Sequence, residues 1–193
     1  MTARLVLASA SPRRRELLAT AGLKVEVIPS DAAESPTEGE EPEAMVRRLA
    51  AAKASVVSAA HPEAFVLGAD TTVVVDGEML AKPAHPREAA LMLRRLSGRW
   101  HEVVTGVALV RAGEILDALA EVTRVHVREL DDVRIARYLA TGEHRDKAGA
   151  YGIQGVASGF VDRVEGSYTS VVGLPVAETL AMLEAHGAIG AWP

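Results

Sequence analysis

The sequence contains no cysteine, and this absence excludes several kinds of chemistry. Without a thiol there is no disulfide bond, no thiolate metal site and no cysteine nucleophile. The six histidines form no HExxH segment and no other paired ligand spacing, so a zinc hydrolase is not predicted. A G-x-S-x-G segment is also missing, which argues against a serine-triad hydrolase of the α/β type.

Long apolar runs and an excess of positive charge are missing as well. No stretch approaches the roughly 20 apolar residues that span a membrane, and the apolar part of Met1 to Ser9 is too short for a signal peptide. We therefore expect a cytoplasmic protein. Because the formal net charge is −5, we expect no nucleic-acid partner and no membrane partner. Any site for an anion must be local.

The remaining composition is that of a globular protein, with 49% hydrophobic and 24% charged residues among 193. This length suffices for one large core or two small lobes. Predicted strands and helices alternate along the chain, without a repeat or a clear linker. We predict an α/β fold in a single domain, residues 1–193, either as one body or as two lobes around a cleft.

Hydrophobic periodicity and end signals give the expected elements. The predicted strands are Leu5 to Ala8, Lys24 to Ile28, a strand from Phe65, Trp100 to Val110, Ile115 to Val127, and Phe160 to Val164. The predicted helices are Arg13 to Ala21, Glu43 to Ala60, Pro86 to Leu96, a short helix from Asp131 or Asp132 to Leu139, and a last helix ending near His186.

The strand from Phe65 is the centre of the predicted site. Its apolar residues give way to Asp70 and Thr71, which we place at the strand end, where a sheet meets solvent. An Asp76-Gly77 turn then reverses the chain and leads to Lys82-Pro83. A carboxylate and a lysine could thus face one cleft, although an Asp satisfied at a strand end and a solvated Lys would give the same pattern.

The first helix begins with an unusual cluster of positive charge. Ser11 suits the N-cap and Pro12 the first helical position, but Arg13, Arg14 and Arg15 follow directly. Three cations in the first turn oppose the positive end of the helix dipole. A bound phosphate or carboxylate would compensate for this repulsion. For Arg13 and Arg14 we favour it over a solvated basic face that pairs with Glu16 or Glu26.

Two further segments offer polar groups to a ligand. The acidic loop from Pro29 to Pro42 carries Glu34, a candidate metal or general-base carboxylate. The next helix has a predicted buried stripe that includes Val56 and Val57, and Lys53 lies on or beside it, where such a lysine more commonly extends its ammonium group to solvent. Between Asp146 and Gly155, three glycines would let the backbone approach a ligand or make tight turns. Gln154 could read a base edge through its paired donor and acceptor.

Carboxylates and cations in this combination suit the hydrolysis of a polyphosphate. Carboxylates hold Mg²⁺ or Mn²⁺ and orient water, while Arg and Lys neutralise charge on the phosphates. The residues alone make this a hypothesis among others.

A set of spaced segments resembles the Maf family of nucleoside triphosphate pyrophosphatases, in the family's order. These segments are Ser9-Ala10-Ser11-Pro12-Arg13-Arg14, Gly68-Ala69-Asp70-Thr71, Lys82-Pro83, Leu96-Ser97-Gly98 with His101, Thr105-Gly106-Val107, the run from Asp146 to Gly155, and Gly173-Leu174-Pro175.

The resemblance implies a fold, a reaction and a set of site residues. The fold would be an elongated, mixed and twisted sheet with flanking helices and two lobes around a nucleotide cleft, as in inosine triphosphate pyrophosphatases. The reaction would convert a nucleoside triphosphate to the monophosphate and pyrophosphate with divalent Mg²⁺ or Mn²⁺. The roles carried over by motif are Asp70 as base and metal ligand, Glu34 as a carboxylate near the metal, Lys82 as a catalytic triphosphate contact, Ser9, Ser11, Arg13, Arg14 and Lys53 as substrate contacts, and Thr71 and Gln154 as base-discriminating residues.

Within the family, Thr71 after Asp70 and the run from Ala150 to Gly155 resemble the branch that acts on dTTP and UTP. Ala81 replaces the glycine that is usual before Lys-Pro, and the acidic loop has fewer carboxylates than many relatives. The alternatives are the 7-methyl-GTP branch and a nucleotide-binding regulator linked to septum formation. The sequence leaves the oligomeric state open, a homodimer included.

Overall fold

The computed structural model describes residues 4–33, residue 35 and residues 37–192. The chain divides into two compact units. The first comprises Met1–Asp70, Thr105–Glu121 and Gly173–Pro193, and the second comprises Thr71–Val104 and Val122–Val172. Strands β3, β5 and β6 contribute residues to both.

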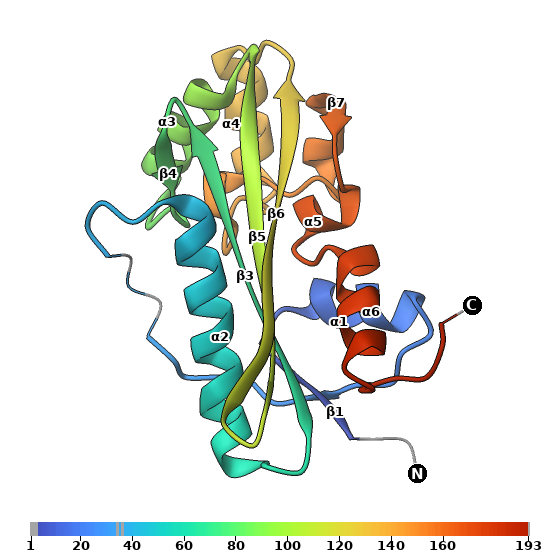
Figure 1. Ribbon diagram of the computed structural model, residues 1–193. Helices are drawn as coiled ribbons and strands as arrows, with labels where there is room; N and C mark the ends of the chain where they lie inside the picture. The colour runs from blue at the N-terminus through green and yellow to red at the C-terminus, as the bar shows by residue number, and fades with distance from the viewer. Residues whose placement is uncertain (1–3, 34, 36, 193) are drawn as a thin grey trace. The chain divides into compact units, whose positions relative to one another are not determined.

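Within the described residues, seven strands form one mixed sheet in the order β2-β1-β3-β5-β6-β7, with β4 paired to β3. The strands are β1 Leu5–Ala8, β2 Glu26–Val27, β3 Phe65–Val75, β4 Glu78–Leu80, β5 Arg99–Arg111, β6 Glu114–Val127 and β7 Val161–Glu165 (Figure 1). The helices are α1 Pro12–Thr20, α2 Pro42–Ala60, α3 Pro86–Leu96, α4 Asp132–Ala140, α5 Tyr168–Val172 and α6 Val176–Ala185, with 3₁₀ turns η1 Ala148–Ala150 and η2 Val156–Gly159. The predicted α/β class with a mixed sheet and flanking helices is confirmed.

In the first unit, β1 lies between β2 and β3 and runs parallel to both. All of β1 is buried, and so is β3 from Phe65 to Ala69. Parallel strands are covered on both faces, so their sequences are continuously apolar rather than alternating. This explains why Leu5 to Ala8 could be recognised as a strand from its composition.

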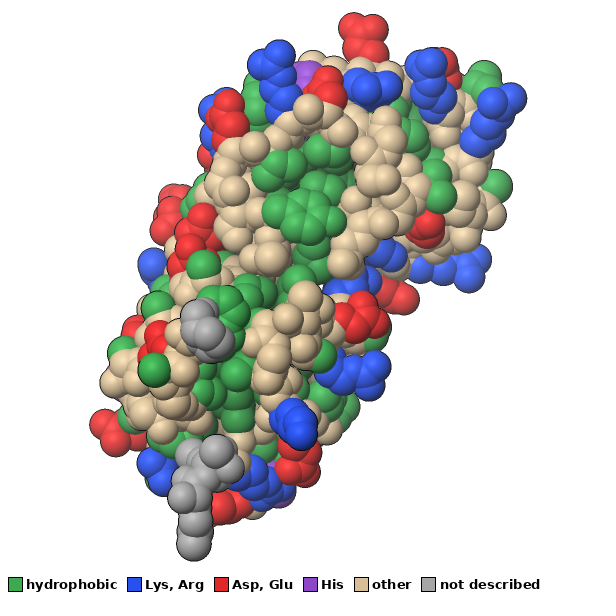
Figure 2. All heavy atoms as spheres, turned by 90° about the vertical axis from the view of Figure 1, so that its right-hand side faces the viewer, with side chains coloured by type: hydrophobic (Ala, Val, Ile, Leu, Met, Phe, Trp, Pro, Cys, Tyr) green, Lys and Arg blue, Asp and Glu red, His purple; other side chains and the backbone are tan. Residues whose placement is uncertain are grey.

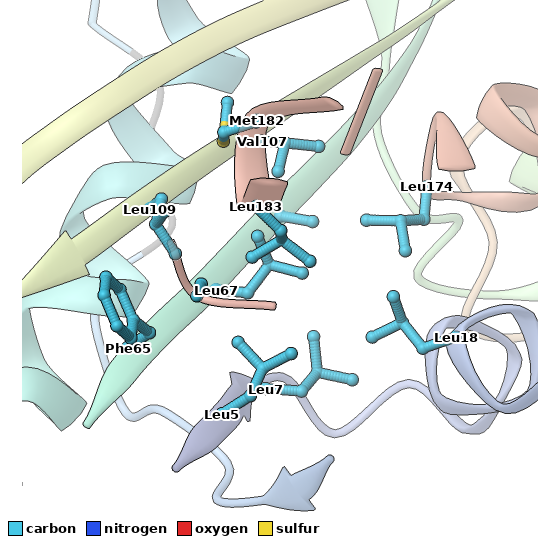
Figure 3. Packing of buried hydrophobic residues seen from close by; sticks show 12 residues of the cluster. Leu5, Leu7, Leu18, Phe65, Leu67, Val107, Leu109, Leu174, Met182 and Leu183 are labelled. Carbon is cyan, nitrogen blue, oxygen red and sulfur yellow. The ribbon is translucent and has the colours of Figure 1, made fainter. Parts of the chain in front are cut away.

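Alternate residues of these strands pack into two clusters on opposite faces of the sheet, as the two-residue period of a strand requires. The cluster shared with α1 and α6 contains Leu5, Leu7, Phe65, Leu67, Leu18 and Leu183 (Figure 3). The cluster shared with α2 contains Val6, Ala8, Val66, Ala54 and Val57. Burial of this apolar surface holds the parallel strands and their helices together.

In the second unit, β3 turns back into β4 at Asp76 and Gly77. Both residues have positive φ, 52° and 77°, as the predicted two-residue hairpin turn requires. Helix α3 packs against α4 and against η1, and β6 pairs antiparallel with β7. Asp131 caps α4 by accepting a hydrogen bond from the Arg134 amide at 2.7 Å, which confirms one of the two predicted caps.

The surface carries charges of both signs. On the face shown in Figure 2, Lys and Arg side chains are interspersed with Asp and Glu side chains. Among the described residues, no helix is both long enough and apolar enough to cross a membrane.

Two details of the predicted elements are wrong. The strand predicted from Lys24 to Ile28 forms only over Glu26–Val27, at the edge of the sheet, where β1 is its pairing partner. Val56, predicted to be buried, is 44% exposed, whereas Lys53 is buried. The cause is that α2 packs on the sheet through its small residues Ala50 and Ala54, which turns Val56 toward solvent.

Asp70 does not mark the end of its strand, contrary to the prediction. β3 continues through Asp70 to Val75, and Asp70 and Thr71 are its two half-buried residues. The β-branched residues from Thr71 to Val75 favour extended backbone, so the strand does not stop where its side chains become polar.

Gly68 in β3 lies directly under α2. A Cβ atom there would sit 2.1 Å from the Ala50 carbonyl oxygen. We expect Gly68→Ala to lower the free energy of unfolding by about 2 kcal/mol or more, because backbone rather than a flexible side chain must move. In the control Gly190→Ala, a Cβ has no neighbour within 4 Å, and a change of about 0.5 kcal/mol or less is expected. Denaturant unfolding measures both, and equal effects would contradict the prediction.

Candidate functional site

The parallel register of β1 and β3 brings two distant segments of the first unit together. Ala8 is paired with Gly68, so Ser9 and Asp70 both follow the paired segment at its carboxyl end. Helix α1 begins just beyond Ser9, at Pro12. In α/β sheets this end of the strands is where ligands bind. The fold therefore places the arginine cluster and the candidate base at the same end of the sheet.

The start of α1 has the predicted form, with Ser11 as N-cap and Pro12 in the first turn. The Ser11 side chain makes no capping hydrogen bond, and no acidic residue lies in the first turn. The backbone N–H groups and the arginines therefore leave this helix end strongly positive. The side chain of Arg13 forms no hydrogen bond or ion pair with the residues that the structure describes. This is the arrangement that an anion would complete.

Arg14 is held in place by the protein itself. Its Nε donates to the Gly173 carbonyl oxygen at 2.7 Å, and its Nη1 donates to Ser9 Oγ at 3.2 Å. Ser9 Oγ also accepts from the Ser11 amide at 3.2 Å. Glu26, which was a predicted alternative partner for the cluster, is bonded to Arg4 instead. Arg14 is therefore an oriented guanidinium rather than a solvated one.

Lys53 and Asp70 form a buried ion pair. Lys53 Nζ lies 2.6 Å from Asp70 Oδ1, and the two side chains are only 9% and 13% exposed. The ammonium group of Lys53 therefore does not extend into solvent, as that of such a lysine more commonly does. An ion pair away from water is costly to form and costly to break by removing one partner. The structure thus holds one ammonium group and one carboxylate away from bulk water, beside the carboxyl end of the paired segment of β1 and β3.

The close packing of α2 on β3 explains how Lys53 reaches Asp70. Because Gly68 has no side chain, the Ala50 carbonyl of α2 can approach the strand. Lys53 lies one turn further along the helix, and Asp70 lies two residues further along the strand, on the same face as Gly68. The missing side chain of Gly68 thus brings lysine and carboxylate together.

Three further predicted residues belong to the second unit. Thr71 is half-buried in β3, and Lys82 is exposed just after β4. Gln154 is exposed in the loop that follows η1, although its neighbours Tyr151 and Ile153 are buried. The Gly149 amide donates to the Ala81 carbonyl at 3.3 Å. This contact ties the loop of Gln154 to the segment of Lys82.

One buried polar pair in the second unit was not predicted as such. His101 of β5 is 3% exposed, and its Nε2 lies 2.7 Å from the Tyr151 hydroxyl oxygen. Burial lowers the pKa of His101 to about 4, with a smaller contribution from the nearby His126. Burial also raises the pKa of the Tyr151 hydroxyl. Both groups are therefore neutral near pH 7. In the sequence, His101 and Tyr151 each belong to one of the segments that carry the family resemblance.

The predicted metal ligands are Asp70, which lies in β3, and Glu34. Glu34 lies outside the described residues, so its predicted role stays a prediction. Within the described part of the chain, no group of three or more His, Asp or Glu side chains could hold a metal ion. Asp70 is the described carboxylate of the predicted set. Mg²⁺ commonly uses one or two carboxylates together with substrate phosphates and water, so this donor set fits such an ion once substrate is bound.

Comparison of the sequence with a family model and with curated proteins gives matches over nearly the whole chain. A protein-family model described as Maf-like protein matches residues 4–186. The dTTP/UTP pyrophosphatase of Myxococcus xanthus is 53% identical over 183 residues, covering 95% of this chain and 92% of that protein. The dTTP/UTP pyrophosphatase of Hahella chejuensis is 51% identical over 187 residues, again covering 95% and 92%. A crystal structure of a nucleoside-triphosphatase / dITP/XTP pyrophosphatase from Mycobacterium abscessus matches at 19% identity and a TM-score of 0.40, covering 66% of this chain and 75% of that chain.

The ion pair of Lys53 and Asp70 predicts a strong energetic coupling. We expect Lys53→Met and Asp70→Asn each to lower the free energy of unfolding by about 2 to 3 kcal/mol, because each leaves a buried charge without its partner. The double variant should lose less unfolding free energy than the two single variants together, with a coupling energy of about 1 kcal/mol or more.

The exposed pair Arg94 and Asp132, with side chains 49% and 76% exposed, is the matched control. Its coupling should be about 0.5 kcal/mol or less. Urea unfolding of the two variant cycles measures both couplings, and additive effects at Lys53 and Asp70 would contradict the prediction.

The depressed pKa of His101 predicts loss of stability in acid. The unfolded chain takes up a proton on this ring near pH 6.5, whereas the folded protein does so only near pH 4. The free energy of unfolding should therefore fall between these pH values, by about 2 kcal/mol from this group by pH 5. Urea unfolding at pH 7.5 and pH 5 measures the loss. His101→Gln cannot titrate at this position, so its free energy of unfolding should fall less between pH 7.5 and pH 5 than that of the wild type. An equal fall would contradict the assignment of this loss to His101.

Proposed function

This chain belongs to the Maf-like protein family, and we propose from that membership that it hydrolyses dTTP and UTP to the nucleoside monophosphate and pyrophosphate. The observation that carries the proposal is identity of about one half, over 95% of the chain, to proteins named dTTP/UTP pyrophosphatase. The cations and the carboxylate of the first unit supply the chemistry that this reaction needs. A cytoplasmic location is part of the proposal, because the nucleotide pool is there.

The triphosphate would be bound by the cations that the sequence singled out. Arg13 and the N-terminal N–H groups of α1 would donate hydrogen bonds to phosphate oxygens. The guanidinium of Arg14, which Ser9 and Gly173 orient, would add positive charge beside them. The hydroxyls of Ser9 and Ser11 lie in the same turn. Lys53 and Lys82 would neutralise further charge on the phosphates.

Asp70 would take the proton from the attacking water. Attack at the α-phosphorus breaks the bond to the β-phosphate, and pyrophosphate leaves with the electron pair. Lys53 binds Asp70 through Oδ1, so Oδ2 is the oxygen proposed to accept the proton. The same lysine fixes the orientation of the carboxylate, which a general base requires.

A divalent cation, Mg²⁺ or Mn²⁺, would supply charge neutralisation at the phosphates when bound. Asp70 would be one of its ligands, and Glu34 is the second carboxylate that the sequence offers. The metal dependence of the reaction is part of the proposal.

Thr71 and Gln154 would discriminate the base. The side-chain amide of Gln154 offers a donor and an acceptor side by side, which matches the N3–H and carbonyl of uracil or thymine. Exposure of Gln154 beside buried neighbours leaves this amide accessible to a ligand.

A nucleotide panel tests the proposed function. We expect pyrophosphate release from dTTP and UTP with Mg²⁺ or Mn²⁺, and no release of orthophosphate. Pyrophosphate and orthophosphate are assayed separately, so the experiment identifies the bond that is cleaved. Turnover of 7-methyl-GTP in preference to both pyrimidine nucleotides, or no turnover at all, would reject the proposal.

Asp70→Asn should lower kcat by about 100-fold or more while nucleotide binding persists, since an amide cannot accept the proton. Asp76→Asn is the matched control, because Asp76 lies at the exposed hairpin turn, where its partner is Arg99. The control should keep wild-type activity. If Asp70→Asn retains turnover, Asp70 is not the base.

A further inference from the structure

The buried pair of His101 and Tyr151 joins the sheet to the loop that carries Gln154. Tyr151 lies three residues before Gln154, and His101 lies in β5. Besides the 2.7 Å hydrogen bond, the two rings pack edge to face, with centroids 5.4 Å apart and planes at 88°. This contact fixes the loop on one side of Gln154.

A second contact fixes the loop on the other side. Glu143 Oε2 accepts a hydrogen bond from the Val156 amide at 2.8 Å. The same carboxylate packs against Gly155, where a Cβ would lie 2.2 Å from Oε2. Glu143 itself is held, because Lys147 Nζ donates to its carbonyl oxygen at 2.5 Å. Gln154 is thus an exposed side chain between two anchored residues, Tyr151 and Val156.

The backbone before Gln154 is also strained. Ala150 is fully buried and has a φ of 63°, a conformation that costs free energy for a residue with a Cβ. Such a conformation persists only when its surroundings determine it, and it is common at ligand sites. The Ala150 amide donates to the Lys147 carbonyl oxygen at 3.1 Å, and the next residue, Tyr151, is bonded to His101.

We propose that His101 and Glu143 are positioning residues that set base selection by fixing the backbone on either side of Gln154. This inference rests on the proposed function above. UTP and CTP differ only at the base edge that a side-chain amide would read, so a small shift of Gln154 changes the preference between them more than it changes binding of the triphosphate. A merely structural role would change the stability of the protein and leave the preference unchanged.

Three variants test the two anchors. Tyr151→Phe removes the hydroxyl and keeps the ring, Glu143→Ala removes the acceptor for the Val156 amide, and Glu143→Gln keeps an acceptor oxygen and should rescue. Tyr168→Phe is the matched control, since Tyr168 is 49% exposed in the same unit.

The measured quantity is the ratio of kcat/KM for UTP to kcat/KM for CTP. We expect the ratio to fall by about fivefold to tenfold in Tyr151→Phe and in Glu143→Ala, while kcat for UTP stays within about threefold of the wild type. Glu143→Gln and Tyr168→Phe should keep the wild-type ratio. Thermal unfolding confirms that each variant is folded. A ratio that stays within twofold of the wild type in both test variants overturns the inference, whatever their stability.

Binding of α,β-imido-UTP and α,β-imido-CTP separates this inference from the proposed reaction, because neither analogue can be cleaved at the bond in question. If the wild type releases no pyrophosphate, the proposed function fails, and the ratio of the two dissociation constants decides the inference alone. Preferential binding of the UTP analogue that is lost in Tyr151→Phe and Glu143→Ala supports it. No preference in the wild type, or a preference that both variants keep, overturns it.

Discussion

The first unit depends on the close contact between helix α2 and strand β3 at Gly68. A helix carbonyl occupies the space of the missing side chain, so the helix lies near enough for Lys53 to reach Asp70. The parallel register of β1 and β3 then places Ser9 and the start of α1 at the same end of the sheet as Asp70. One absent Cβ and one strand register thus assemble groups from three segments of the chain.

The charges gathered there are oriented rather than solvated. Lys53 is bonded to a carboxylate away from water, and the guanidinium of Arg14 is fixed by the Gly173 carbonyl and the Ser9 hydroxyl. Fixed charges need little reorganisation when a polyanion binds, and a dry environment strengthens their interaction with it. The unfavourable charges in the first turn of α1 are therefore consistent with selection for binding an anion rather than for helix stability.

The second unit shows how an exposed side chain can be held by buried ones. Gln154 is exposed, whereas Tyr151 is bonded to His101 of the sheet and Val156 is bonded to Glu143. The contact of Gly149 with Ala81 joins this loop to the segment of Lys82. Functional loops commonly combine an accessible tip with a rigid base in this way.

The sequence by itself determined the identity of most elements, because their signals are local: Ser11 and Pro12 start α1, Asp76 and Gly77 turn β3 into β4, and Asp131 caps α4. It also named Asp70, Lys53 and Arg14 as site residues. It could not show that β3 runs on through Asp70, that β2 is short or that Val56 is exposed, because strand pairing and helix packing are set by residues far away in the chain. Short elements such as α5 gave no periodic signal. Only the tertiary structure decided that Lys53 is paired with Asp70, that Gly173 orients Arg14, and that His101 and Glu143 hold the loop of Gln154, since each contact joins residues whose distance in sequence carries no information about their distance in space.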